Sequence, residues 1–338
     1  MLVELKDLAP LLLKKERVNG DIDPAVLTNL LRGGEAANDR RKQLIKVIEQ
    51  HPVLSDRDMM YRNHSERYNV GLKKAFHYVE LLQNANYTDE EQAILLGALG
   101  EQVPFDLHRG MFIPTIESQG TDNQRAKWLP LAKNYKIIGA YAQTELDVRL
   151  RCKAHIPEKL GDFQVLLEAF RVRATRALRS LAESMQATTN DSNACMLLMT
   201  HTSVAHTELM LLESFMRGIE NLPVGNEKTA LANLCSLFGA WLINKSLGDF
   251  RQHDYLSSNQ VSLVHEQIVR LLPIVRKSCI LLTDAWDFTN FELNSTIGDY
   301  NGDIYRAIVK RVGDEPLNQT DVAEGYEEYL KPLIQSGL

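Results

Sequence analysis

Apolar side chains recur at intervals of three and four residues through most of the second half of the chain. From Phe163 to Met185 this spacing draws one apolar stripe, with most of the arginines lying elsewhere. Such a period is typical of a long amphipathic α-helix. The same pattern is repeated in three further segments, residues 194–219, 227–245 and 261–286. The sequence therefore predicts a helical bundle after Asp147.

Proline interrupts the last of these segments. Pro273 lacks an amide donor, and its ring crowds the preceding turn, so we expect it to kink or break the helix there.

The first half of the chain shows helix start and stop signals. Asp23 and Pro24 precede an apolar run that ends at Gly33, which is the order of capping residue, first-turn proline and terminating glycine that a short helix requires. Strand-like alternation is scarce, so we predict an all-α fold with a mainly helical unit before Asp147. Three further helix starts are predicted from capping-box spacing, at Ser55/Asp58, Thr88/Glu91 and Thr121/Gln124.

Composition places the chain among ordinary globular proteins. Its 338 residues, 44% of them hydrophobic, are enough for two cores of normal size. A net charge of -6 with scattered Lys and Arg argues against nucleic-acid binding. The most apolar segment, Thr229–Asn244, is shorter than the roughly 20 residues of a membrane span, so we predict a buried core helix. The acidic and basic residues in "MLVELKDLAP" argue against a secretory signal.

Cysteine and histidine spacing predicts no metal site. The four cysteines form no CxxC pair, so we expect buried thiols in a reducing compartment at Cys152, Cys195, Cys235 and Cys279. His201 and His206 are five residues apart, about 140° around a helix, and would not face one ligand together. The acids in "TDEEQ", Thr88–Gln92, are explained by a solvated helix N-terminus. Short motifs for phosphate binding, zinc proteases and nucleophile elbows do not occur.

Two stretches mix aromatic, glycine and acidic residues in a way that favours loops over helix stripes. The first comprises residues 104–116 and 128–145, and the second comprises residues 284–309. Tyr141, Gln143 and Thr144 would offer hydroxyl and amide groups to a planar polar ring. They would equally serve as edge-strand residues bonded to backbone, and the residues alone favour this second interpretation.

These stretches also carry a resemblance. "DLHRGMFIPTI" followed by "IIGAYAQTE" resembles the N-terminal α-domain of the peroxisomal acyl-CoA oxidase family. "DAWDF" followed by "IGDYNGDIYRAI" is similar to the signature of that family's C-terminal helical domain. The two matches occur in the family's order and together cover essentially the whole chain. The resemblance implies an N-terminal helical domain over 1–146, a junction over 147–165 and a C-terminal helical domain over 166–335.

The resemblance also implies that the middle of the family's chain is missing. In the family, "YAQTE" continues into a β-domain that carries much of the FAD site, whereas here Leu146 leads directly into a charged segment. Among cofactor contacts, only Thr144 matches a family residue that approaches the flavin. The family's base glutamate has no counterpart, because Glu158 and Glu168 lie in a different sequence context. We therefore assign no catalytic residue and expect little or no oxidase activity.

The implied family reaction is FAD-dependent oxidation of a fatty acyl-CoA to a trans-2-enoyl-CoA, with O2 reduced to hydrogen peroxide. The resemblance implies FAD as the cofactor, but the missing β-domain argues against its retention by this chain. We expect a homodimer or a mixed dimer with full-length acyl-CoA oxidase. A non-catalytic helical partner or regulator of that enzyme is the alternative. Peroxisomal localisation is implied, but Gly337 replaces the basic residue of the usual C-terminal tripeptide at Ser336–Leu338, and the chain would otherwise be cytoplasmic.

Overall fold

The computed structural model describes residues 2–140, 163–188, 191–322 and 325–336. Within these ranges the regular elements are all helical and there is no strand, which confirms the predicted all-α class. The chain divides into two compact units, each described here by itself. The first unit comprises Met1–Lys15, Arg32–Gln143 and Asp287–Leu338, and the second comprises Glu16–Leu31 and Thr144–Trp286.

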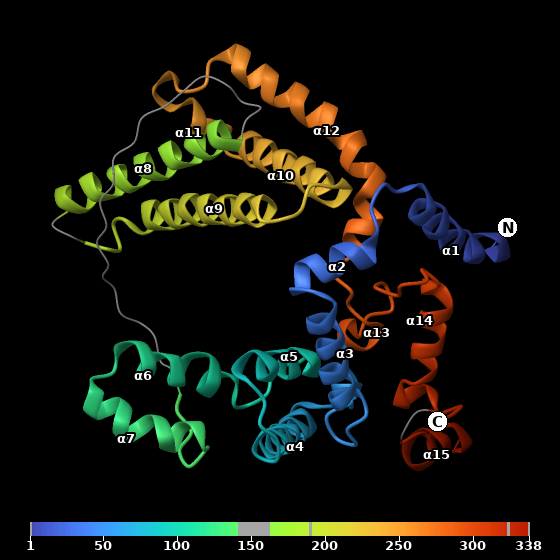
Figure 1. The fold of residues 1–338 in the computed structure, drawn as a ribbon. Coiled ribbons are helices and arrows are strands. Elements are labelled where there is room, and N and C mark those ends of the chain that lie inside the picture. Colours follow the sequence, from blue (N-terminus) through green and yellow to red (C-terminus); the bar gives the residue numbers. More distant parts are fainter. Residues whose placement is uncertain (1, 141–162, 189–190, 323–324, 337–338) are drawn as a thin grey trace. The chain divides into compact units, whose positions relative to one another are not determined.

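The second unit is built on four long helices, α8 (Phe163–Ala187), α9 (Met196–Glu220), α10 (Asn226–Lys245) and α12 (Ser258–Asp284). Helix α8 packs against α9, α9 against α10, and α10 against α12 (Figure 1). The short helices α11 (Leu247–Arg251) and η3 (Gln252–Asp254) connect α10 to α12. The predicted apolar stripes form one core, which includes Phe170, Leu212, Cys235, Ile243 and Phe250. The predicted bundle is confirmed, and Pro273 does not break α12.

A buried ionic network lies in this bundle. The guanidinium of Arg173, on α8, donates to Glu208 on α9 and to the Asp249 carboxylate at 2.8 Å. The His201 Nε2 atom lies 2.9 Å from the same Asp249 carboxylate. The carboxylates required for burying a charged arginine are thus supplied by two other helices, α9 and α11. His201 serves in this network, and the described residues contain no cluster of side chains suited to a metal ion.

Helix α2 (Pro24–Arg32) packs against the core of the second unit through Leu27. Asp23 Oδ1 accepts the amide of Ala25 at 2.8 Å, which is the predicted helix start. The Thr28 hydroxyl donates to the Ala285 carbonyl at 3.0 Å, directly after α12. Gly33 ends the helix with a φ of 84°, a left-handed conformation that favours glycine at this position.

The first unit contains shorter helices. In order they are α1 (Leu2–Asn19, whose last turn belongs to the second unit), α3 (Glu35–Glu49), η1 (Asp58–Tyr61), α4 (His64–Gln83), α5 (Asp89–Leu99), η2 (His108–Phe112), α6 (Ile113–Gln119), α7 (Asp122–Lys133), α13 (Asn290–Leu293), α14 (Ile304–Gly313), η4 (Pro316–Asn318), η5 (Tyr326–Leu330) and α15 (Lys331–Gln335). The core of this unit is formed by α3, α4 and α5, with Leu44, Ile48, Leu54, Leu95 and Leu99 fully buried.

Two of the three predicted capping boxes are confirmed. Thr88 caps α5 and Thr121 caps α7, each with the reciprocal bond from the third helical residue. The box predicted at Ser55 is wrong, because the Ser55 hydroxyl instead donates to the His51 carbonyl at 2.6 Å. A capping box forms downstream at Asn63 and opens α4.

Three other expectations can be compared with the structure. Residues 108–116, 128–133, 290–293 and 304–309 are helical, so the prediction of loops in these parts of the two stretches is wrong. Cys195 and Cys235 are buried and Cys279 is half-buried, all as free thiols, whereas Cys152 lies outside the described residues. Burial raises the pKa of the Cys235 thiol to about 12, so it is inert at neutral pH. The apolar segment Thr229–Asn244 forms most of α10, and within the described ranges no helix is long and apolar enough to cross a membrane.

Candidate functional site

His108 lies at the centre of the first unusual stretch. It begins the π-helical turn η2 and is 1% exposed. The amide of Gly139 donates to its Nδ1 atom at 3.0 Å, so Nδ1 is the unprotonated nitrogen. Nε2 therefore carries the proton and donates to the Ala132 carbonyl, also at 3.0 Å. One neutral tautomer satisfies both bonds, and it holds the chain that leaves α7 against η2.

Aromatic packing surrounds this histidine. The Phe112 ring stacks on His108 with centroids 5.5 Å apart, and the Tyr135 ring lies 5.3 Å away on a tilted plane. A Cβ atom at Gly139 would overlap the Phe112 ring, so the close approach of backbone to ring requires glycine. We call His108, Phe112, Tyr135 and Gly139 the His108 anchor.

Arg109, the next residue, bonds to side chains on α4 and α5. Its guanidinium donates to the Tyr78 hydroxyl at 2.8 Å and to the Gln92 side-chain oxygen at 2.7 Å. Burial raises the pKa of Tyr78 to about 12 against the opposing effect of Arg109, and burial also raises the pKa of Tyr135. Arg109 thus joins η2 to α4 and α5, while His108 joins it to the segment after α7.

The predicted cofactor contact lies just beyond this anchor. Thr144 follows Gly139 by five positions and, with Tyr141 and Gln143, lies outside the described residues. The His108 anchor fixes the last described part of the chain before Thr144. The sequence predicts no role for His108, because one histidine among apolar residues carries no signal that separates an anchor from ordinary packing.

Within the second unusual stretch, residues 284–309, Phe291 and Glu292 serve packing and capping. The Arg57 guanidinium lies 3.9 Å from the Phe291 ring centroid, and Glu292 pairs with Arg41. Glu292 also accepts the amide of Thr289 at 2.9 Å and so completes the capping box of α13. Phe291 and Glu292 are therefore used within the first unit, in packing, pairing and capping. Asp284, which falls in the second unit, pairs with Arg17 at 2.7 Å.

Of the two glutamates near the junction, the structure describes Glu168. Glu168 lies on α8 with its carboxylate 3.9 Å from Arg171 Nη1, in an ordinary surface pair. Glu158 lies outside the described residues.

Comparison with known protein families places both unusual stretches. Residues 23–138 match the family model described as acyl-coenzyme A oxidase N-terminal, and residues 162–335 match the model described as acyl-CoA oxidase. The chain belongs to the acyl-CoA oxidase family. His108, Phe112 and Tyr135 of the His108 anchor lie within the first match, and Gly139 follows it directly. The stretch 284–309 lies within the second match. Residues 139–161, which include Thr144, are matched by neither model.

Individual acyl-CoA oxidases give the extent of the similarity. The chain is 32% identical over 197 residues to peroxisomal acyl-coenzyme A oxidase 1 of Arabidopsis thaliana, covering 56% of this chain and 29% of that protein. It is 36% identical over 133 residues to peroxisomal acyl-coenzyme A oxidase 2 of Mus musculus, covering 39% and 19%. The matched part is thus less than a third of the length of these curated relatives.

Solved structures of acyl-CoA oxidases share the fold. The structure of Arabidopsis thaliana acyl-CoA oxidase 1 aligns with a TM-score of 0.75 at 16% identity, covering 96% of this chain and 99% of that one. Acyl-CoA oxidase-2 of Caenorhabditis elegans, solved with FAD, ascaroside-CoA and ATP, aligns with a TM-score of 0.75 at 15% identity, covering 97% of each chain.

Two cavities of the second unit do not fit FAD, the cofactor that the family implies. A flavin dinucleotide needs donors or cations for its pyrophosphate. Arg109, the arginine nearest the His108 anchor in sequence, already bonds to Tyr78 and Gln92. In the second unit, a cavity of about 720 Å³ has no basic residue in its lining, and a cleft of about 320 Å³ contains Arg270 next to Glu266. The larger cavity therefore offers no cation to a pyrophosphate, and in the smaller one Arg270 donates to Gln267 at 3.1 Å.

Proposed function

We propose that this chain is a form of peroxisomal acyl-CoA oxidase in which the N-terminal helical domain, residues 1–146, passes through a junction, residues 147–165, into the C-terminal helical domain, residues 166–335. The observation that carries this proposal is the order of the two family matches, which are separated only by residues 139–161. Membership of the family supports fatty acyl-CoA oxidation, giving trans-2-enoyl-CoA and hydrogen peroxide, as the activity from which this form descends. Peroxisomal localisation is proposed from the relatives, whose names place them there.

Within this proposal the chain has lost most of its catalytic power. The His108 anchor would still position the backbone that enters Thr144, the proposed flavin contact. No glutamate of the chain is assigned as the base, and loss of a positioned base costs about two to four orders of magnitude in rate. The cavity of about 720 Å³ in the second unit also offers no cation to the dinucleotide. Hydrogen bonds and packing around one edge of a site do not replace the preorganised groups on which catalysis depends.

Flavin retention and peroxide formation test the proposal together. The purified chain is incubated with excess FAD and desalted, and bound flavin is read from visible absorbance. Peroxide release is then measured with saturated acyl-CoA substrates of several chain lengths, with a full-length acyl-CoA oxidase as the positive control. We expect little bound flavin and little peroxide. Stoichiometric flavin with turnover close to that of the full-length enzyme would contradict the proposed impairment.

A second candidate function is that of a non-catalytic partner of full-length acyl-CoA oxidase. The observation that favours it is an exposed apolar stripe on α14, formed by Tyr305, Ile308, Val309 and Val312. An amphipathic helix with such a face is suited to association with another protein surface.

Co-expression tests this second function. A tagged copy of this chain is expressed with an untagged full-length oxidase, and the complex is isolated through the tag. Val309→Asp, on the stripe, should abolish a mixed dimer formed through α14, whereas Lys310→Asp on the polar face of the same helix should leave it intact. Failure of the unmodified chain to retain the full-length enzyme would rule this function out.

A further inference from the structure

Helix α9 has an uncharged, exposed side in addition to the side that packs in the core. Leu212, Met216 and Ile219 belong to the core of the second unit. The exposed side is formed by Leu197, Thr200, Val204, Thr207, Leu211 and Ser214. We call these six residues the α9 seam.

The spacing of the α9 seam is typical of packing between helices. Its residues are separated alternately by three and four positions, as in a period of about 3.5 residues. None of them is charged, although the solvent side of a helix usually carries charged residues. The Thr200 hydroxyl donates to the Met196 carbonyl at 3.0 Å, so another chain can cover it without breaking its hydrogen bond.

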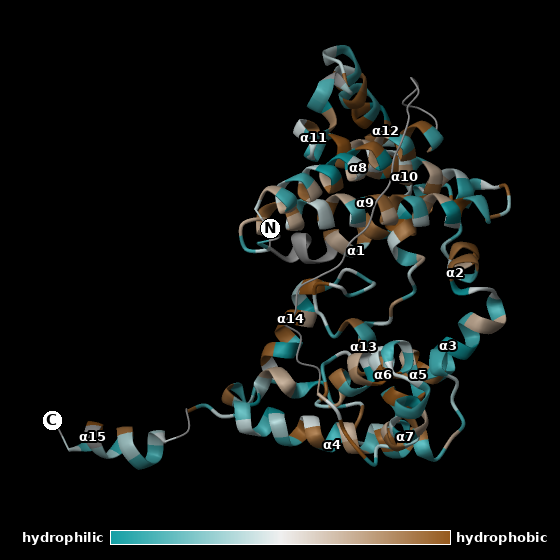
Figure 2. Cartoon of the chain, turned by 90° about the vertical axis from the view of Figure 1, so that its left-hand side faces the viewer, coloured by the Kyte–Doolittle hydropathy of each residue, from teal (hydrophilic) through white to brown (hydrophobic). Residues whose placement is uncertain are grey.

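The two ends of the seam differ in shape. Leu197, at one end, is 86% exposed. Gly218 continues the spacing at the other end, and a Cβ atom built there would meet no heavy atom within 4 Å. With Ser214, Phe215 and Leu234 it lines an apolar cavity of about 720 Å³. Helices α2, α10 and α12 supply the other walls, and Figure 2 draws α2 largely in the colour of hydrophobic residues.

This arrangement is self-complementary. A two-fold axis at Thr207 places a second copy of α9 antiparallel to the first, and Leu197 and Gly218 lie ten and eleven positions from Thr207. Leu197 of each copy then meets Gly218 of the other, and Val204 meets Leu211. A parallel arrangement would oppose Leu197 to itself and leave both cavities open. A closed dimer with two-fold symmetry requires a self-complementary surface of this kind.

Charge agrees with the same pairing. Glu208 of α9 is buried and paired with Arg173. Glu213 pairs with Arg171 at 3.4 Å and with Arg217 at 3.2 Å, within the second unit. The α9 seam itself is uncharged, so two copies can meet along it without opposing like charges or removing a seam charge from water.

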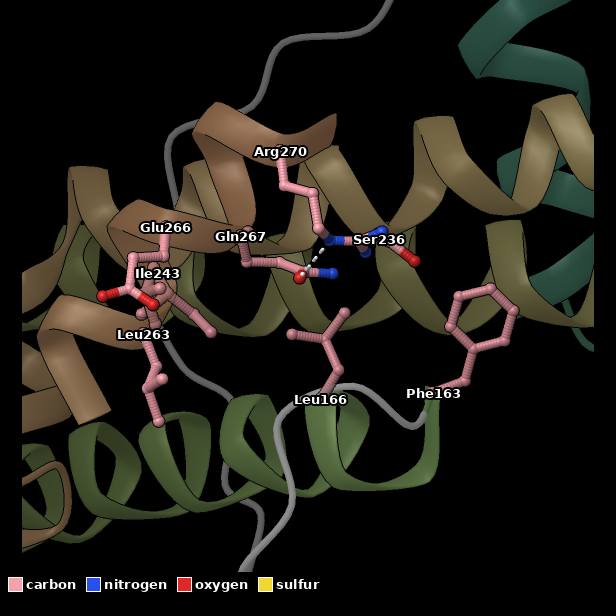
Figure 3. Close-up of a pocket in the computed structure, with 10 residues that line it drawn as sticks. Phe163, Leu166, Ser236, Ile243, Leu263, Glu266, Gln267 and Arg270 are labelled. Atoms are coloured by element: carbon pink, nitrogen blue, oxygen red, sulfur yellow. Dashed lines mark hydrogen bonds between the residues drawn. The ribbon is translucent and has the colours of Figure 1, made fainter. Parts of the chain in front are cut away.

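Another exposed side of the unit provides a contrast. The cleft of about 320 Å³ between α8, α10 and α12 has Leu166 and Ile243 beside a rim that carries Glu266 and Arg270 (Figure 3). Covering this rim would remove two charged side chains from water, which costs free energy. The α9 seam carries no such cost.

The size of the seam sets the expected strength of the contact. From Leu197 to Gly218 the helix is about 32 Å long, and a width of about 10 Å gives a footprint of about 320 Å². Entry of Leu197 into the apolar cavity at both ends adds to this contact. Stable interfaces bury about 800 Å² per partner. We therefore expect a reversible dimer with a dissociation constant of about 1 to 100 µM.

We propose that a second copy of this chain docks antiparallel along the α9 seam, with Leu197 of each copy in the apolar cavity beside Gly218 of the other. The uncharged seam and the matching of its two ends carry the proposal. It depends neither on flavin binding or oxidase activity nor on the apolar stripe of α14, so it can fail separately from the proposed functions.

Sedimentation equilibrium of the full chain tests the association over loading concentrations of about 1 to 200 µM. We expect the mean mass to rise from that of the monomer towards that of the dimer. Leu197→Glu should raise the dissociation constant about tenfold or more, because it brings a charge to the apolar cavity of the other copy. The melting temperature should not fall, since Leu197 is exposed in the first turn of α9, where an acidic residue is favoured.

Val269→Glu is the matched control for this substitution. Val269 is 69% exposed on α12 of the same unit and lies outside the seam, so the dissociation constant should be unchanged. Val309→Asp on α14 separates the two apolar surfaces of the chain. It should also leave this dimer intact.

Cysteine cross-linking tests the register. Among the described cysteines, Cys279→Ser leaves only buried thiols, and Cys152→Ser removes the remaining one. In this background, Thr207→Cys should form a disulfide between two copies under mild oxidation, because the two-fold axis brings position 207 of both copies together. His206→Cys, at the next position and also exposed, turns about 100° away around the helix and should not.

Four results would overturn the proposal. The first is a monomer at all concentrations, which would show that no second copy covers the seam. The second is an equal effect of Leu197→Glu and Val269→Glu. Loss of the dimer in Val309→Asp would assign the contact to α14 instead. Equal cross-linking through Thr207→Cys and His206→Cys would contradict the antiparallel register.

Discussion

At the scale of single residues, the contacts of His108 account for its buried position. Both ring nitrogens are bonded to backbone atoms, and two aromatic rings pack on the ring itself. Gly139 is required by the same packing, because any side chain there would overlap Phe112. The role of His108 is therefore positioning, since it fixes the chain shortly before Thr144.

His108→Phe tests this role. The substitution keeps an aromatic ring but removes the acceptor of the half-buried Gly139 amide, while the Ala132 carbonyl keeps its bond from the Tyr135 amide, so we expect a loss of about 1 kcal/mol in the free energy of unfolding. Urea denaturation followed by circular dichroism measures the change. His64→Phe, at an exposed histidine of the same unit, is the control and should have little effect. Equal effects of the two substitutions would show that the buried bonds contribute nothing.

A second residue-scale prediction concerns acid stability. The Arg62 hydrogen bond is the largest influence on Asp56 and holds the pKa of this carboxyl below its ordinary value. The pair therefore stabilises the fold above the unfolded-state pKa of about 3.9, and this contribution is lost as the pH falls through the lowered native value. Asp56→Asn should lower stability by more at pH 6 than at pH 2, as measured by urea denaturation at both pH values. A constant difference at the two pH values would contradict the assignment.

At the scale of helices, sequence signals predicted the elements better than their detailed ends. The stripes of residues 163–185, 194–219, 227–245 and 261–286 correspond to α8, α9, α10 and α12, because a 3.6-residue period is a property of the local sequence. Four-residue capping patterns were less informative. Ser55 has the same spacing as Thr121 but bonds to a preceding carbonyl, since tertiary packing sets which backbone amides are left free.

The two capping patterns predict different responses to alanine. Thr121→Ala removes the cap of α7 and should cost about 1 kcal/mol of unfolding free energy. Ser55→Ala removes no cap and should change the free energy by less than about 0.5 kcal/mol. Thermal denaturation of the two variants under identical conditions measures this difference. A larger loss at Ser55 than at Thr121 would contradict the structural assignment.

At the scale of the whole molecule, the fold class and the family could be predicted from the sequence, and the matches over residues 23–138 and 162–335 confirm the family. The His108 anchor could not be predicted, because the His108 ring bonds to backbone groups, the Ala132 carbonyl and the Gly139 amide, that lie 24 and 31 residues along the chain. The apolar cavity could not be predicted either. Its lining residues belong to ordinary amphipathic stripes, and only their packing shows that Gly218 faces open space.

The central proposal is that this acyl-CoA oxidase chain joins the family's two terminal helical regions without a complete flavin site. The most direct test is the flavin-to-protein ratio after incubation with excess FAD and desalting, read from the visible absorbance of the purified chain. We expect a flavin-to-protein ratio close to zero, with no peroxide formed from acyl-CoA. A ratio close to one would contradict it, because it would show that the chain, including the segment around Thr144, builds a complete cofactor site.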